Sequence, residues 1–127
     1  MERFLLVCLA GAVGTGVRYL VGLWAGERFG GAFPFATLIV NIAGCFFISL
    51  VMHTAMHSSS ITPTVRVVLT TGFLGGLTTY SSFNLETTRL FLEGSSMTGL
   101  VNLVATLLGC FGAGLLGLFL AKRLVGA

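Results

Sequence analysis

Residues 72–83 read Gly72-Phe-Leu-Gly-Gly-Leu-Thr-Thr-Tyr-Ser-Ser-Phe83, and they lie within nineteen uncharged residues between Arg66 and Glu86. The uncharged length suits a membrane span, because a hydrocarbon core of about 30 Å needs about 20 helical residues. The composition does not suit an unbroken helix, since each glycine weakens a helix by about 1 kcal/mol and the hydroxyl groups compete for backbone partners. The stretch therefore predicts a span that breaks at its centre, which at membrane depth indicates a functional site.

The composition of the rest of the chain extends this prediction to the whole protein. The 127 residues are 55% hydrophobic and 9% charged, and their mean hydropathy is +1.00, far too apolar for a soluble domain. Three further uncharged runs cover residues 4–17, 30–52 and 94–121. We therefore predict an all-α membrane protein in one transmembrane domain, residues 1–127, with spans at about 4–24, 34–52, 65–92 and 97–120.

Several alternative classes fit the sequence less well. The first run resembles a signal peptide, but no small-residue cleavage site is followed by a hydrophilic chain, so it is kept as a span. Cys8, Cys45 and Cys110 all fall inside spans, which favours small apolar side chains over disulfides or a metal cluster. The net charge of +3 is too diffuse to indicate a nucleic-acid partner.

Polar side chains recur every four residues in the second span. Thr37, Asn41, Cys45 and Ser49 share one helix face by this spacing. Such a stripe either hydrogen-bonds to a neighbouring helix or lines a pore, and the spacing leaves both roles open. The fourth span repeats the pattern with Asn102, Thr106 and Cys110.

Three further residues stand out for their chemistry. Arg18 lies about six residues inside the first span, where a buried charge must be paired or functional. Anchoring a loop or a helix end is favoured there over a direct role in an ion path. His53 and His57 are expected in a polar connector, residues 52–64, because no third metal ligand is near.

The charges that flank the spans give almost no preference for one orientation. Four basic residues would lie on the side of the termini and three on the other. A difference this small leaves the positive-inside rule little to act on. The same polypeptide is therefore expected to insert in both orientations.

The central stretch resembles the third-span signature of the Fluc, or CrcB, fluoride channels. The resemblance extends to Gly14-x-x-x-Arg18, to Thr37-Leu-x-x-Asn41 and to Glu86, and so covers essentially the whole chain. It implies an antiparallel dual-topology homodimer with two pores, in the inner or plasma membrane of a prokaryote. The implied activity is passive fluoride export that lowers cytoplasmic fluoride.

The resemblance also implies roles for individual residues. Asn41 is the polar pore residue, and Tyr80 and Phe83 occupy the two positions of an aromatic box, where the family pattern most often has Phe in place of Tyr80. The backbone carbonyls of Gly75 and Thr78 would hold a structural sodium ion at the dimer axis, with an ordered water as the alternative occupant. The remaining candidate pore residues are Thr37, Thr79, Ser82, Thr106 and Cys110, whereas Arg18 and Glu86 are expected to be structural.

The residue types themselves suit a fluoride path. Fluoride is small and tightly hydrated, so a selective pore must replace its water with close donors such as amides, hydroxyls and the positive edges of aromatic rings. The runner-up is a small dual-topology multidrug exporter, which would need an intramembrane carboxylate in the first span, where none follows Glu2. A third reading is an assembly subunit that binds a partner through glycine faces, and no nucleophile-base pair or metal set indicates an enzyme.

Overall fold

The computed structural model describes residues 1–126, which fold into helices joined by short connections, with no strand in that range. Two long helices, α1 (Glu2–Phe29) and α2 (Phe35–His57), are followed by a series of shorter ones. The series is α3 (Pro63–Val67), the π-helix η1 (Val68–Leu74), α4 (Gly75–Leu77) and α5 (Tyr80–Leu92). The last helix, α6 (Ser96–Val125), is the longest of those described.

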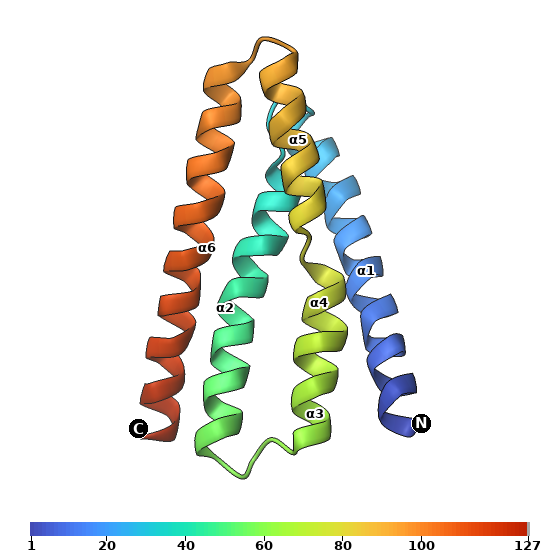
Figure 1. Cartoon of the computed structure of the whole chain (residues 1–127), viewed down its shortest axis with the longest axis vertical. Helices are drawn as coiled ribbons and strands as arrows, with labels where there is room; N and C mark the ends of the chain where they lie inside the picture. Colours follow the sequence, from blue (N-terminus) through green and yellow to red (C-terminus); the bar gives the residue numbers. More distant parts are fainter. Residues whose placement is uncertain (127) are drawn as a thin grey trace.

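The long helices run side by side along the molecule (Figure 1). α6 and α1 lie on opposite flanks, with α2 and the series from α3 to α5 between them. Both termini and the α2–α3 connection lie at one end, whereas the α1–α2 connection and the α5–α6 turn lie toward the other. The chain therefore passes along the long axis four times, with its third passage made of short helices.

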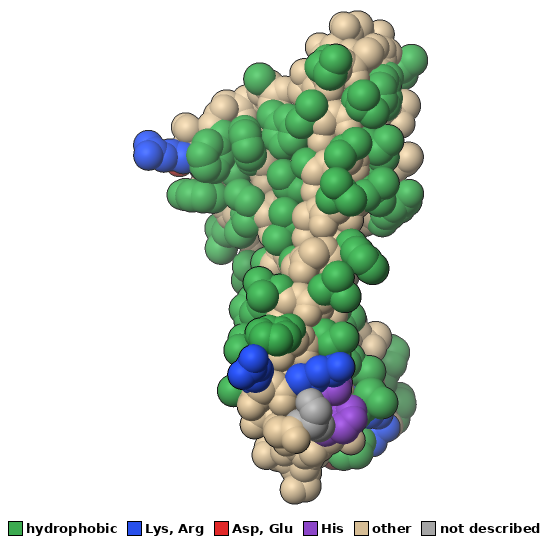
Figure 2. All heavy atoms as spheres, turned by 90° about the vertical axis from the view of Figure 1, so that its left-hand side faces the viewer, with side chains coloured by type: hydrophobic (Ala, Val, Ile, Leu, Met, Phe, Trp, Pro, Cys, Tyr) green, Lys and Arg blue, Asp and Glu red, His purple; other side chains and the backbone are tan. Residues whose placement is uncertain are grey.

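Most of the apolar side chains face outward. Six hydrophobic side chains in residues 1–126 are buried, and the face on the α6 side is largely hydrophobic (Figure 2). The accessible surface is 7844 Å², against about 6,500 Å² for a compact soluble protein of this mass. Three helices, α1, α2 and α6, are long and apolar enough to cross a membrane. The molecule is a membrane protein whose outer surface is suited to lipid or to a partner.

Close backbone contact explains how α1 packs against the third passage. A Cβ atom on Gly14 would collide with the carbonyl oxygen of Phe73, and one on Gly76 would collide with the carbonyl oxygen of Gly11. Small residues thus let two helix backbones meet, as is common in membrane bundles. Beside this contact, Val40, Leu74 and Leu77 form a small buried cluster.

A similar contact joins α2 to α6. A Cβ atom on Gly117 would collide with the carbonyl oxygen of Phe46, and one on Gly109 would approach the Ile42 side chain at 3.0 Å. Above this contact, Asn102 is 1% exposed and donates from Nδ2 to Thr87 Oγ1 at 2.9 Å. This bond ties α6 to α5.

The helices extend further than the sequence predicted. α2 continues to His57, so the expectation that His53 and His57 lie in a connector is wrong. Their rings stack with centroids 4.1 Å apart, as the i, i+4 spacing of a helix allows. The extension reflects the good helix formers Met52, Ala55 and Met56, which continue the helix past the uncharged run.

Candidate functional site

The candidate site is built around a two-residue interruption between α4 and α5. Thr78 (φ −86°, ψ 156°) and Thr79 (φ −154°, ψ 114°) are extended. Thr79 then caps α5, because its Oγ1 accepts a hydrogen bond from the Ser82 N–H at 3.2 Å. Threonine is a favourable residue at this position, so the local sequence explains both the stop and the new start.

Asn41 on α2 fixes the position of the extended segment. Its Nδ2 donates to the carbonyl oxygen of Thr79 at 3.0 Å, and its Oδ1 accepts from the Thr79 N–H at 2.8 Å. A two-bond amide bridge of this kind leaves one Nδ2 hydrogen unused, since a carboxamide nitrogen carries two. Asn41 therefore holds the interruption in place and keeps a donor for a second partner.

These bonds release two backbone carbonyls. In an unbroken helix the Thr79 and Ser82 N–H groups would donate to the carbonyls of Gly75 and Thr78, four residues earlier. Here the Thr79 N–H donates to Asn41 and the Ser82 N–H donates to the Thr79 hydroxyl. Gly75 and Thr78 are the two residues whose carbonyls the sequence analysis assigned to a sodium ion.

Arg18 and Thr15 on α1 take up a third carbonyl at the same place. Arg18 Nε donates to the carbonyl oxygen of Gly76 at 3.1 Å, and Thr15 Oγ1 donates to the same atom at 3.4 Å. Such contacts are what the anchoring of a helix end requires. Thr15 was not singled out in the sequence, although it lies three residues before Arg18 on the same helix face.

Eight of the predicted site residues line one cavity of about 350 Å³ between α2, α6 and the interrupted segment. They are Asn41, Gly75, Thr78, Thr79, Tyr80, Phe83, Thr106 and Cys110. The cavity wall also includes Gly44, which has no side chain to occupy the place of the Thr78 methyl group. The structure thus gathers amide, hydroxyl, thiol and aromatic groups around freed backbone oxygens.

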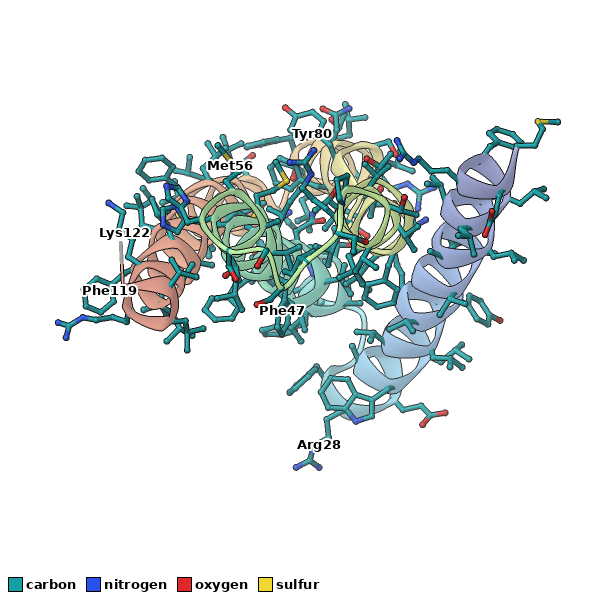
Figure 3. All side chains as sticks on the ribbon, turned by 90° about the horizontal axis from the view of Figure 1, so that it is seen from below. Arg28, Phe47, Met56, Tyr80, Phe119 and Lys122 are labelled. Atoms are coloured by element: carbon teal, nitrogen blue, oxygen red, sulfur yellow. The ribbon has the colours of Figure 1, made fainter. Side chains whose placement is uncertain are left out.

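The two aromatic side chains of the cavity differ in exposure. Phe83 is 3% exposed and Tyr80 is 76% exposed, and their rings meet edge to face with centroids 5.5 Å apart. Seen along the long axis, Tyr80 lies at the periphery of the bundle (Figure 3). The cavity therefore has a buried aromatic wall and an outward-facing one.

Thr106 supplies a buried hydroxyl to this cavity. The residue is 6% exposed, and its Oγ1 has no hydrogen-bond partner within residues 1–126. A buried hydroxyl without a partner costs free energy. It is thus suited to donate to a ligand in the cavity.

Three of the other predicted site residues lie outside this cavity. Thr37 Oγ1 donates to Glu86 Oε1 at 2.7 Å, and Glu86 Oε2 is buried with no hydrogen-bond partner among the described residues. Ser82 Oγ accepts from the Thr79 hydroxyl at 3.1 Å, so it lies next to the cavity rim.

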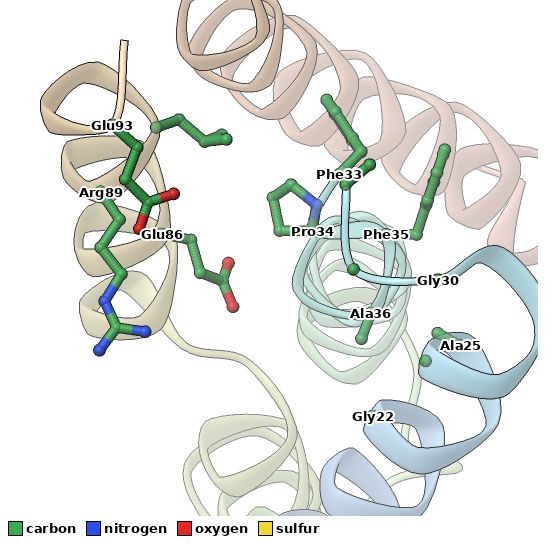
Figure 4. Close-up of a pocket in the computed structure, with 14 residues that line it drawn as sticks. Gly22, Ala25, Gly30, Phe33, Pro34, Phe35, Ala36, Glu86, Arg89 and Glu93 are labelled. Carbon is green, nitrogen blue, oxygen red and sulfur yellow. The ribbon is translucent and has the colours of Figure 1, made fainter. Parts of the chain in front are cut away.

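Glu86 instead belongs to a second cleft, of about 320 Å³, between α5 and the α1–α2 connection. Figure 4 shows its carboxylate projecting from α5 toward that connection, with Arg89 and Glu93 on the same helix. The two hollows are therefore chemically distinct, since the first carries neutral donors and freed carbonyls and the second carries charged side chains.

Comparison with known proteins gives a consistent result along the chain. Residues 5–118 match the family model described as CrcB-like protein, Camphor Resistance (CrcB). A protein of Anaeromyxobacter dehalogenans named fluoride-specific ion channel FluC is 44% identical over 126 residues, which cover 99% of this chain and 100% of the relative. Proteins with the same name from Sorangium cellulosum and Rhizobium meliloti are 45% and 42% identical, each with 98% of its own length covered.

Proposed function

This chain belongs to the CrcB family of fluoride-specific ion channels, and on that premise we propose that its 350 Å³ cavity is part of a fluoride path. The protein is an ion channel and not an enzyme, and it lets fluoride leave the cell passively. The observation that supports placing the path here is the convergence of eight predicted residues on one cavity.

The cavity offers the chemistry that a fluoride ion needs. The unpartnered Thr106 hydroxyl and the unused Asn41 hydrogen are neutral donors, and aromatic rings present positive edges. Neutral donors replace hydration without binding the anion so tightly that it cannot leave. Phe83, which is buried and fixed, suits this purpose better than an exposed ring.

We propose that two copies of the chain assemble in opposite orientations. One protomer leaves Tyr80 and a large apolar surface exposed, and the cavity is bounded on its outer side by that exposed ring. The near-equal charge at the two ends of the helices supports insertion both ways. A second copy would cover the exposed aromatic residue and complete the path.

The interruption between α4 and α5 is proposed to serve as a break at the middle of a membrane-crossing third passage, with a structural sodium ion at the dimer axis. The fit rests on the released carbonyls of Gly75 and Thr78, because two copies would present four oxygen ligands and no backbone N–H. A hard monovalent cation is satisfied by such oxygens. The ion would supply positive charge close to the anion path.

A small multidrug exporter receives no support from the comparisons. Its required carboxylate is also absent from the interior of α1, because the acidic residues of that helix, Glu2 and Glu27, lie at its two ends. A subunit that only binds a partner would also leave the interruption and the polar cavity unexplained. We place the channel in the plasma membrane of a prokaryote.

Fluoride efflux from liposomes tests the function directly. Purified protein is reconstituted into vesicles loaded with potassium fluoride, and efflux is started with a potassium ionophore and followed with a fluoride electrode. We expect rapid release of fluoride and no comparable release of chloride from matched vesicles. Release no faster than from protein-free vesicles would contradict the proposal.

A further inference from the structure

Two of the three cysteines form a pair inside the bundle. Cys45 on α2 and Cys110 on α6 both line the 350 Å³ cavity, and both also line a neighbouring apolar cavity of about 420 Å³. Both cysteines are partly buried, and they lie on two helices that pack against each other. The third cysteine, Cys8, is exposed on α1. The pair therefore stands between two hollows, and Cys8 does not belong to it.

The packing of α2 against α6 brings the two cysteines to the same part of the bundle. Gly109 and Gly114 flank Cys110, and Cβ atoms there would lie 3.0 Å from the Ile42 side chain and 3.7 Å from the Cys45 carbonyl oxygen. Glycines at these contacts bring the helices close on both sides of the pair. Cys45 and Cys110 thus lie at one contact between two closely packed helices, beside the same two hollows.

We propose that Cys45 and Cys110 form a binding site for a soft d10 metal cation such as Cu⁺, Ag⁺ or Hg²⁺, and that occupation of this site blocks the fluoride path. Soft thiolate ligands select metals of this kind. No group of three or more His, Cys, Asp or Glu side chains that could hold a metal is found in residues 1–126. A two-sulfur site without further ligands suits cations that accept two ligands and disfavours Zn²⁺, which takes four.

Metal binding to the two thiols requires no oxidant. Two S–H bonds break, two metal–sulfur bonds form, and both protons pass to water, with no change in oxidation state. The inhibition rests on the proposed function, because a metal at Cys110 obstructs fluoride only if the cavity is part of the path. The metal site itself does not depend on it.

Mercury titration in a Cys8→Ser background tests the site, because only the two paired thiols remain. We expect one Hg²⁺ per chain to remove both thiols from reaction with a thiol dye and to produce a mercury–thiolate charge-transfer absorption. Adding Cys45→Ser or Cys110→Ser should weaken binding at least tenfold, whereas Mg²⁺ should produce no absorption. Consumption of two Hg²⁺ per chain, or mercury-linked dimers on a denaturing gel without reductant, would overturn the paired site.

Fluoride efflux from the same preparations tests the inhibition. Each variant is compared with its own metal-free rate, so a change in basal flux does not affect the result. Hg²⁺ should reduce flux at least tenfold in the Cys8→Ser protein and less than twofold when Cys45 and Cys110 are both serine. Binding without a loss of flux would overturn the inhibition. Absence of flux before any metal is added would instead contradict the proposed function, and the absorption titration would still decide the site.

Discussion

Asn41 illustrates how one side chain can provide both structure and chemistry. Its amide holds the Thr79 backbone through two hydrogen bonds and retains one free hydrogen at the cavity. The sequence left open whether Asn41 contacts a neighbouring helix or lines a pore. In the structure Asn41 binds the backbone of the segment before α5, and it also lines the 350 Å³ cavity.

Asn41→Ala should therefore destabilise the protein. The change leaves the Thr79 N–H and carbonyl without partners, and each unsatisfied buried group costs about 1–3 kcal/mol. We expect a lower thermal unfolding midpoint in detergent and faster amide exchange at Thr79. The control is Ser49→Ala on the same face of α2, which should leave both unchanged. Equal stability of the two variants would show that the amide bridge is not formed.

Phe83→Ile tests the aromatic edge of the proposed path. Isoleucine keeps apolar bulk at this buried position but removes the ring quadrupole. Fluoride flux in liposomes should fall at least tenfold, while dimer formation in cross-linking experiments should persist. The matched change Phe47→Ile concerns a ring that is 47% exposed on α2 and should leave flux within twofold. Undiminished flux in Phe83→Ile would remove the ring from the path.

At the scale of helices, packing depends on a few contacts that admit no side chain. Two pairs of small residues on α1 have the same four-residue spacing, but Ala10 with Gly14 faces the third passage, whereas Ala12 and Gly16 are exposed. The periodicity could not distinguish them, because both pairs have the same spacing and their partners lie about 60 residues away. Which face of a helix packs inward depends on the neighbouring helices of the bundle. A local sequence pattern carries no information about those neighbours.

Gly14→Ala should weaken the packing of α1 against η1 and α4. The added methyl group meets rigid backbone at Phe73 and Leu77, and overpacking of this kind costs about 1–3 kcal/mol. Gly16→Ala is the control, since nothing lies within 4 Å of a Cβ atom there. The unfolding midpoint in detergent, followed by the gel mobility of the folded protein, should fall for Gly14→Ala only. A similar shift for both would indicate a general effect on the helix.

The third passage shows which features can be predicted from the sequence and which cannot. Its glycines and hydroxyl residues predicted a break at the centre of residues 72–83, because those preferences act within a few residues, and in that range Thr78 and Thr79 are extended. The π-helical turn before it and the bond from Thr37 to Glu86 were not predicted, since both depend on contacts between distant segments. Likewise, the polar spacing on the last helix did not reveal that Asn102 binds Thr87.

At the scale of the whole molecule, both termini lie at the same end of the bundle (Figure 1). The basic residues expected at that end are Arg3, Arg66, Lys122 and Arg123. Those expected at the other end are Arg28, Arg89 and the deeper Arg18. A difference of one charge supports the proposal that the chain inserts in both orientations. In either orientation, the exposed apolar surface of the chain can contact lipid or a second copy.

Reporter fusions at the C-terminus test this balance. We expect signals from a reporter active in the cytoplasm and from one active outside it, because the chain is proposed to insert both ways. Ser58→Lys together with Ser59→Lys adds charge to the α2–α3 connection and should favour the cytoplasmic signal, since basic loops stay in the cytoplasm. A signal from only one side in the unmodified protein would contradict dual insertion.

The hydrogen bonds that turn the Thr79 and Ser82 N–H groups away from Gly75 and Thr78 also set the sign of the electric field at the centre of the chain. Carbonyl oxygens without donors present only the negative ends of their dipoles, and two inverted copies would double that effect. Left alone, this field would be an energy barrier to a passing anion. The cation proposed for the axis would screen this field and make the midpoint passable, so replacing sodium with a cation too large to enter should slow fluoride efflux as well as loosen the proposed dimer.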